Sequence, residues 1–225
     1  ATAAADEQAL TLDDKRARAF ARRFADMHAE VALGQYLDIA AEQTPLDPER
    51  SDVLNVSDAL EVALHKSAHY SVVHPAILGA ICGASTLDDG EALARSLEEI
   101  LTPWGLAFQL RDDDLGVFGD PAVTGKPAGD DLREGKRTVL LALTWEASSP
   151  AERSALTEVL GVAEASPERL SAATRIVEAN GRAPHEAEIA RLVADGHAAL
   201  EASSFDDGAR AMLRELCAIL TARRA

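Results

Sequence analysis

The residues best suited to chemistry lie on one predicted helix, where two adjacent carboxylates stand on a polar face. Gln109, Asp112, Asp113 and Gly116 stand at i, i+3, i+4 and i+7, so on a helix they share one face, with Asp114 off to the side. Carboxylate oxygens bind hard cations, and this pair favours Mg²⁺ over zinc. The stretch therefore predicts a Mg²⁺ site on a helix.

Two lysines follow these carboxylates. The segment from Gly119 to Gly129 is rich in glycine and proline, carries Lys126, and is followed closely by Lys136. Flexible lysine side chains and a bound cation both neutralise phosphate oxygens. Metal-holding carboxylates followed by such lysines therefore suit a diphosphate group.

Polar residues also interrupt two earlier apolar patterns. Gln35 and Asp38 stand at i, i+3, and on spacing alone they are a solvated polar pair. Lys66, which precedes Ser67 and Tyr70 in an apolar run, is costly to bury without a partner. It either extends to solvent or faces an anion, and the residues themselves favour neither.

Two histidines lie near this lysine. His65 and His69 stand at i, i+4, which is the spacing of a two-histidine metal pair. No third ligand is apparent in the sequence at a suitable spacing. We therefore interpret both as surface or core histidines.

An all-helical chain must position these residues. Ala and Leu abound, aromatic residues make up only 4%, and strand-like runs of Val, Ile and Thr are missing. Ser57 is the expected N-cap of the helix over residues 57–84. The helix over residues 88–119 should continue through Pro103. With no linker or internal repeat, one domain over residues 1–225 is expected. The predicted helices cover residues 13–43, 57–84, 88–119, 138–147, 151–161, 167–180, 184–203 and 206–223.

Charge and composition argue against several classes of function. The net charge of −16 disfavours nucleic acid or an anionic membrane surface as the main partner. An anionic substrate fits only if bound Mg²⁺ reverses the local field. No stretch reaches the roughly 18 to 20 apolar residues of an integral membrane segment. Cys82 and Cys217 are expected to be reduced core residues, which predicts a cytoplasmic protein.

Three motifs together resemble one known family, the trans-isoprenyl diphosphate synthases. FQLRDDDLGVFGD followed by GKPAGDDLREGKRT resembles the second aspartate-rich region of farnesyl, geranylgeranyl and longer polyprenyl diphosphate synthases. HKSAHY resembles the family's Lys-Thr pair with Ser in place of Thr, and GQYLD resembles the helix that borders the substrate cavity. The resemblance implies an all-α isoprenoid synthase-type bundle around a central cavity. It also implies a homodimer.

The resemblance assigns roles to individual residues. Asp112 and Asp113 would hold Mg²⁺ on the diphosphate of an allylic substrate, which isopentenyl diphosphate then attacks. The catalytic group would comprise Gln35, Lys66, Lys126 and Lys136. Lys66, Lys126 and Lys136 would also contact substrate, together with Asp38, Ser67, Tyr70 and Gln109. The implied activity is Mg²⁺-dependent synthesis of a longer isoprenyl diphosphate.

The sequence departs from the family pattern in two places. Gly116 stands where the last Asp of the DDxxD motif is usual, which we interpret as a variation. The family's first aspartate-rich motif is not found, so we expect this chain to be the C-terminal two-thirds of a longer one, with N-terminal helices missing. The alternatives are a non-catalytic regulatory or small subunit and a class I terpene cyclase, although GKPAGDDLREGK does not resemble the cyclase metal motif.

Overall fold

The computed structural model describes residues 11–125 and 127–221, and its regular structure is helical, with no strand in these ranges. This confirms the all-α class predicted from the composition. The elements are α2 (Asp14–Gln43), η1 (Ser51–Val53), α3 (Val56–Ala63), η2 (Leu64–Val73), α4 (His74–Gly83), α5 (Leu87–Phe118), α6 (Pro121–Thr124), α7 (Asp130–Glu134), α8 (Val139–Ala147), α9 (Pro150–Thr157), α10 (Pro167–Asn180), α11 (Arg182–Ala202) and α12 (Asp207–Thr221).

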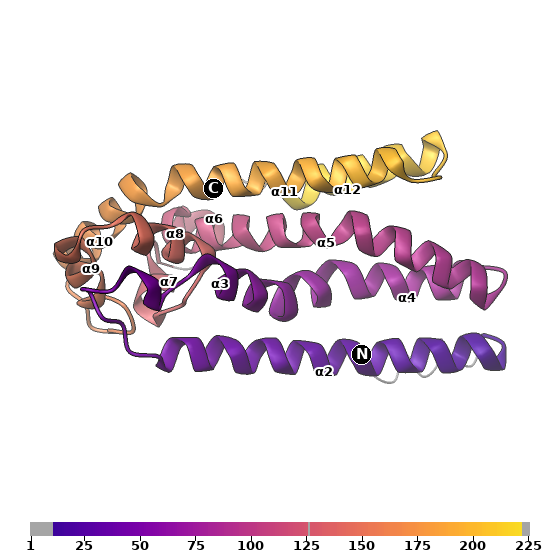
Figure 1. The fold of residues 1–225 in the computed structure, drawn as a ribbon, viewed down its shortest axis with the longest axis horizontal. Coiled ribbons are helices and arrows are strands. Elements are labelled where there is room, and N and C mark those ends of the chain that lie inside the picture. Colours follow the sequence, from indigo (N-terminus) through magenta and orange to yellow (C-terminus); the bar gives the residue numbers. More distant parts are fainter. Residues whose placement is uncertain (1–10, 126, 222–225) are drawn as a thin grey trace.

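The long helices run side by side along the molecule (Figure 1). α5 lies at the centre and packs against η2, α4 and α11, while α2 packs against η2 and α4 from the far side. The short helices α7 to α10 gather at one end (Figure 1). Because α5 carries the predicted acidic face and η2 carries Lys66, their contact brings the two motifs together.

The predicted second helix is divided into three parts. Asn55, not Ser57, caps it, because the Asn55 side chain accepts a hydrogen bond from Asp58 N at 2.8 Å. From Leu64 the backbone widens into a π-helix, which gives way to α4 at His74. Pro75 lies in the first turn of α4, directly after the π-helix.

The apolar side chains form two packed clusters. One lies around Leu110, Val139 and Trp145, and the other around Ile77 and Trp104. Both tryptophans satisfy their indole N–H groups: Trp104 donates to Val193 O at 3.2 Å and Trp145 to Arg50 O at 2.9 Å. No described helix is both long enough and apolar enough to cross a bilayer.

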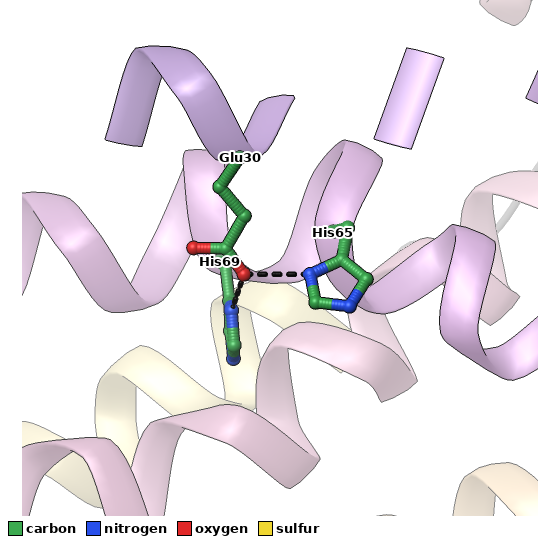
Figure 2. A group of neighbouring side chains, drawn as sticks. All are labelled: Glu30, His65 and His69. Atoms are coloured by element: carbon green, nitrogen blue, oxygen red, sulfur yellow. Dashed lines mark hydrogen bonds and ion pairs between the residues drawn. The ribbon is translucent and has the colours of Figure 1, made fainter. Parts of the chain in front are cut away.

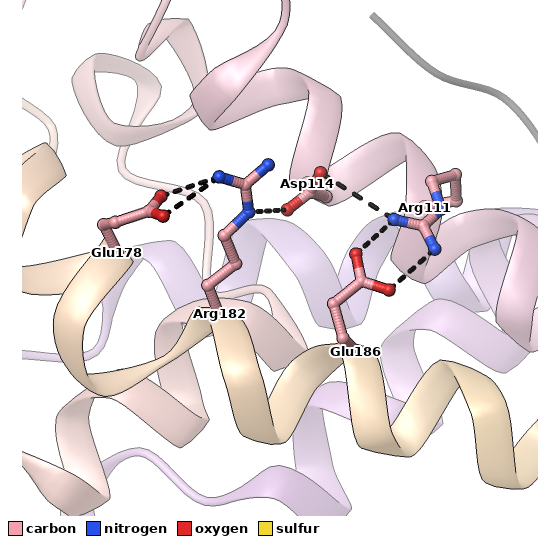
Figure 3. A network of polar contacts seen from close by, with 5 residues as sticks. All are labelled: Arg111, Asp114, Glu178, Arg182 and Glu186. Carbon is pink, nitrogen blue, oxygen red and sulfur yellow. Dashed lines mark hydrogen bonds and ion pairs between the residues drawn. The ribbon is translucent and has the colours of Figure 1, made fainter.

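A charged network fixes α5 against α10 and α11 (Figure 3). The buried Asp114 lies between Arg111 of α5 and Arg182 of α11, at 3.9 and 3.5 Å. Arg111 also pairs with Glu186, and Arg182 with Glu178. Asp114 thus points to a different side of α5 from Asp112 and Asp113, as the helical spacing predicts.

Candidate functional site

A cavity of about 230 Å³ opens between η2, α5 and the segment that follows α7. It unites residues from six separate elements or loops, and both predicted metal ligands are among them. Its lining is Asp38, Ala59, Val62, Ala63, Lys66, Ser67, Gln109, Asp112, Asp113, Asp131, Lys136, Arg137 and Thr138. The structure therefore brings together side chains that lie up to 100 residues apart in the sequence.

Asp113 is the buried member of the acidic pair. Its side chain accepts a hydrogen bond from Gln109 Nε2 at 2.7 Å, one helical turn earlier. Burial raises the pKa of Asp113 to about 8, and the nearby Asp131 and Asp112 carboxylates add to this effect, while Gln109 and Lys136 oppose it. Asp112, the neighbour, is exposed at the cavity. A buried carboxylate among other carboxylates favours a bound cation.

Asp131 lies beside the acidic face at the position where Gly116 has no side chain. A Cβ added to Gly116 would overlap the Asp131 carboxylate. The loop reaches this position because Gly129 N donates to Val117 O at 3.1 Å, which ties α7 to the end of α5. Asp131 is only 7% exposed. A third carboxylate from a different element thus stands where the acidic motif lacks its last Asp.

Lys136 brings a positive charge to the same side of the cavity. Its Nζ forms an ion pair with Asp131 and a second one with Glu134 at 2.9 Å. Burial alone would lower the pKa of Lys136, but these hydrogen bonds outweigh it and raise the pKa above its usual value. The side chain is therefore an ammonium ion at neutral pH.

Lys66 faces an anion, which resolves the choice that the sequence left open. Its Nζ forms an ion pair with Asp38 of α2, whose side chain is buried. Lys66 and Ser67 both line the cavity from η2. Asp38 is therefore not part of a solvated polar pair, because it holds Lys66 at the cavity wall.

Three predicted residues are not placed at the cavity. Gln35 and Tyr70 are exposed and are not among its described lining residues. Because three residues turn a helix by about 300°, Gln35 and Asp38 are offset by about 60°, so one can be exposed while the other is buried. Lys126 lies outside the described residues.

Sequence reasoning missed three polar residues of the cavity: Asp131, Arg137 and Thr138. Arg137 is tethered by its Nη1, which donates to Gly135 O at 2.9 Å, and burial lowers its pKa. Thr138 caps α8 by accepting a hydrogen bond from Leu141 N at 3.2 Å. The signal for Asp131 was its place five residues before Lys136, since Lys136 follows the end of α7 and its N donates to Asp131 O at 3.1 Å.

The carboxylate oxygens that line the cavity are the kind of ligand that Mg²⁺ prefers. The carboxylates of Asp112, Asp113 and Asp131 offer only oxygen, and no described histidine or cysteine lines the cavity. Burial and the neighbouring Asp131 and Asp112 carboxylates raise the pKa of Asp113, and a bound cation would oppose this by favouring the ionised form. Residues of this kind, beside Lys66 and Lys136, can hold a divalent cation together with a polyanion.

Comparison with known proteins places the chain in a defined group. Residues 4–177 match the family model described as polyprenyl synthetase. The chain is 31% identical over 231 residues to (2E,6E)-farnesyl diphosphate synthase of Mycobacterium tuberculosis, covering 98% of this chain and 59% of that protein. It is 33% identical over 163 residues to geranylfarnesyl diphosphate synthase of Aeropyrum pernix, covering 72% of this chain and 46% of that one.

Solved structures agree with this grouping. The fold superposes with a TM-score of 0.82 on geranylgeranyl pyrophosphate synthase of Corynebacterium glutamicum complexed with isoprenyl diphosphate and magnesium, at 39% identity, covering 95% of this chain and 57% of that one. The polyprenyl synthetase of Streptomyces coelicolor gives a TM-score of 0.80 at 28% identity, with 97% and 63% covered. This chain spans about half of the length of the curated relatives that it matches.

Proposed function

This chain belongs to the polyprenyl synthetase family, and we propose that it carries the Mg²⁺- and diphosphate-binding part of a trans-prenyltransferase. The observation that carries the proposal is the cavity in which Asp112, Asp113 and Asp131 meet Lys66 and Lys136. Synthases of prenyl diphosphates among its relatives, and a structural neighbour complexed with isoprenyl diphosphate and magnesium, support the same substrate class.

The proposed reaction joins an allylic diphosphate to isopentenyl diphosphate. The allylic C–O bond breaks, and diphosphate leaves with the bonding electrons. The double bond of isopentenyl diphosphate attacks the resulting carbocation-like carbon, so that a C–C bond forms. Loss of one proton restores an alkene. The products are a longer isoprenyl diphosphate, diphosphate and a proton.

The cavity residues would act on the leaving group. Mg²⁺, when bound, supplies positive charge that offsets the charge of the diphosphate. Lys66 and Lys136 are already held at the cavity by Asp38 and Asp131, so they can shift their contacts to phosphate oxygens without a large loss of side-chain freedom. Such prearranged charge stabilises the departing anion, which is the largest catalytic effect expected here.

Other aspects of the assignment rest on the family resemblance. We propose that Lys126 also contacts the diphosphate, that Mg²⁺ is the metal, and that the protein acts as a homodimer in the cytoplasm. Gln35 and Tyr70 receive no support from the cavity lining.

The test is prenyl transfer to labelled isopentenyl diphosphate, with geranyl or farnesyl diphosphate as the allylic substrate. Asp112→Ala should lower Mg²⁺-dependent turnover by about 100-fold or more, because an exposed metal ligand is lost while the helical core is untouched. Asp195→Ala is the matched control, since Asp195 is an exposed aspartate that pairs with Arg191 on α11. Unchanged turnover in the Asp112 variant would contradict the proposal that Asp112 is a metal ligand. A wild-type chain that binds the substrates but forms no product would favour the non-catalytic subunit.

A further inference from the structure

A second group of possible metal ligands lies between α2 and η2, formed by residues that the cavity does not use. Glu30 comes from α2, and His65 and His69 come from η2 (Figure 2). His74 at the start of α4 contacts the same carboxylate. The sequence suggested no third ligand for the two histidines, because Glu30 lies 35 residues before His65. Only the fold brings it to them.

One oxygen of Glu30 lies between the two imidazole rings (Figure 2). His65 Nδ1 is 2.7 Å from Glu30 Oε1, and His69 Nδ1 also contacts that oxygen. The three ligand atoms all lie within 4.8 Å of one another. Ligands of a tetrahedral ion are about 3.3 Å apart for bonds of about 2.0 Å, so small side-chain shifts would suffice.

His74 orients the carboxylate from the other side. Its Nε2 is 2.6 Å from Glu30 Oε2. Its Nδ1 is buried and has no hydrogen-bond partner in the described part of the chain, so the proton of a neutral ring belongs on Nε2. His74 then donates to Glu30 and leaves Oε1 facing the other two rings. In metal sites, a residue that does not bind the metal commonly holds a ligand in position through such a hydrogen bond.

The cluster is also electrostatically suited to a cation. In the described part of the chain, the ion pairs of the Glu30 carboxylate are with His65, His69 and His74 and not with a lysine or arginine. The side chains of His65 and His69 are 23% and 17% exposed, which leaves a path from solvent.

We propose that Glu30, His65 and His69 bind one first-row divalent transition-metal ion of the Zn²⁺ class. Two imidazole nitrogens and one carboxylate oxygen favour such an ion over Mg²⁺, which prefers oxygen alone. The ion would connect α2 to η2 next to Lys66, in a region where the two backbones are so close that only glycine fits at position 34. The alternative is that hydrogen bonds alone hold the glutamate and the histidines together and that the cluster has no affinity for metal.

The test is direct binding of Zn²⁺ to the whole chain, by calorimetry and by metal analysis after gel filtration, in the presence of excess Mg²⁺. We expect one Zn²⁺ per chain, a rise in Tm on loading, and weaker binding in acid because a protonated imidazole cannot bind a metal. His65→Ala and His69→Ala should each abolish this binding. His74→Ala should weaken it by about 10- to 100-fold.

His28→Ala serves as the matched control, because His28 is an exposed histidine on α2 whose Nδ1 contacts the backbone oxygen of Phe24 at 2.8 Å. It should bind Zn²⁺ like the wild type. Circular dichroism must show that each variant is folded. Absence of binding to the folded wild type, or equal binding by the folded His65 and His69 variants, would overturn the proposal. None of these results depends on prenyl transfer.

Discussion

Gly116 leaves room for the Asp131 carboxylate next to Asp113. The acidic motif has a glycine where its family usually has an aspartate, and by sequence alone this weakens the metal site. In the fold, the space that a side chain at position 116 would occupy is filled by Asp131. The loss of one carboxylate from α5 is thus matched by a carboxylate from α7.

Gly116→Ala tests this relationship. The added methyl group would overlap Asp131, so the carboxylate and its partner Lys136 must move. We expect Mg²⁺-dependent activity to fall by about 10- to 100-fold. Gly79→Ala is the control, because that helical glycine has open space around it and alanine there should be neutral or stabilising by up to about 1 kcal/mol. Equal activities of the two variants would contradict the role given to Asp131.

The buried His185 should make the free energy of unfolding depend on pH. It is fully buried, and neither ring nitrogen has a hydrogen-bond partner in the described residues. Burial lowers the pKa of His185 to about 4. The unfolded chain therefore binds a proton at a higher pH than the folded chain, and the free energy of unfolding should fall as the pH drops from about 6.5 to about 4, by on the order of 3 kcal/mol.

His185→Leu should remove this acid sensitivity. Leucine has no group to protonate, so the variant should gain stability relative to the wild type as the pH falls through that range. Urea unfolding at several pH values measures the difference. A difference that stays constant between pH 7 and pH 4 would show that His185 does not titrate as described.

At the scale of elements, α5 depends on its charged contacts with α10 and α11. Arg111 pairs with Glu186 and lies near the buried Asp114, so it fixes the helix that carries both proposed metal ligands. The pKa of Glu186 is lowered, chiefly by the hydrogen bond with Arg111.

Arg111→Ala should therefore destabilise the fold by roughly 2 to 4 kcal/mol, since Asp114 loses one of its two arginine neighbours while staying buried. Arg191→Ala removes an arginine whose side chain is 54% exposed and which pairs with Glu188 and Asp195 of its own helix, so its cost should stay below about 1 kcal/mol. Denaturant unfolding compares the two. Similar losses would mean that the α5–α11 network adds no particular stability.

The helices were largely predictable from the sequence, and their interruptions were not. Apolar periodicity and caps placed α2, α5 and α10 to within one or two residues. The π-helix of η2 depends on packing against α2 and α5, which no local pattern encodes. The short helix α6 lies in the segment rich in glycine and proline, and α7 follows that segment directly; neither was among the predicted helices.

The candidate site was predictable where one helix carries it. Gln109, Asp112 and Asp113 follow from helical spacing, but Asp131 and Arg137 come from turns whose direction the spacing does not define. Glu30 is the clearest case, because its link to His65 and His69 exists only in three dimensions. Sequence reasoning found the site residues that helical spacing or the family resemblance marked, including Asp38, Lys66 and Lys136, and missed those that only tertiary contacts bring there.

At the scale of the whole molecule, positively charged side chains gather at the cavity where we propose that this acidic protein binds a diphosphate. The chain has a net charge of −16, yet Lys66, Lys136 and Arg137 all line the same cavity. Because Asp38, Asp112, Asp113 and Asp131 line it too, these cations alone do not make the cavity positive. A bound metal ion is therefore needed for a diphosphate to bind well.

The most direct test of this account is the affinity of the chain for an allylic diphosphate, measured by calorimetry with Mg²⁺ and with a chelator. We predict that Mg²⁺ tightens binding by at least about tenfold, equivalent to ~1.4 kcal/mol, and that Asp113→Asn removes this gain. The Asp195→Ala control should retain it. Equal affinities with Mg²⁺ and with the chelator, or an undiminished Mg²⁺ effect in the Asp113 variant, would contradict the claim that this cavity holds a metal-bound diphosphate.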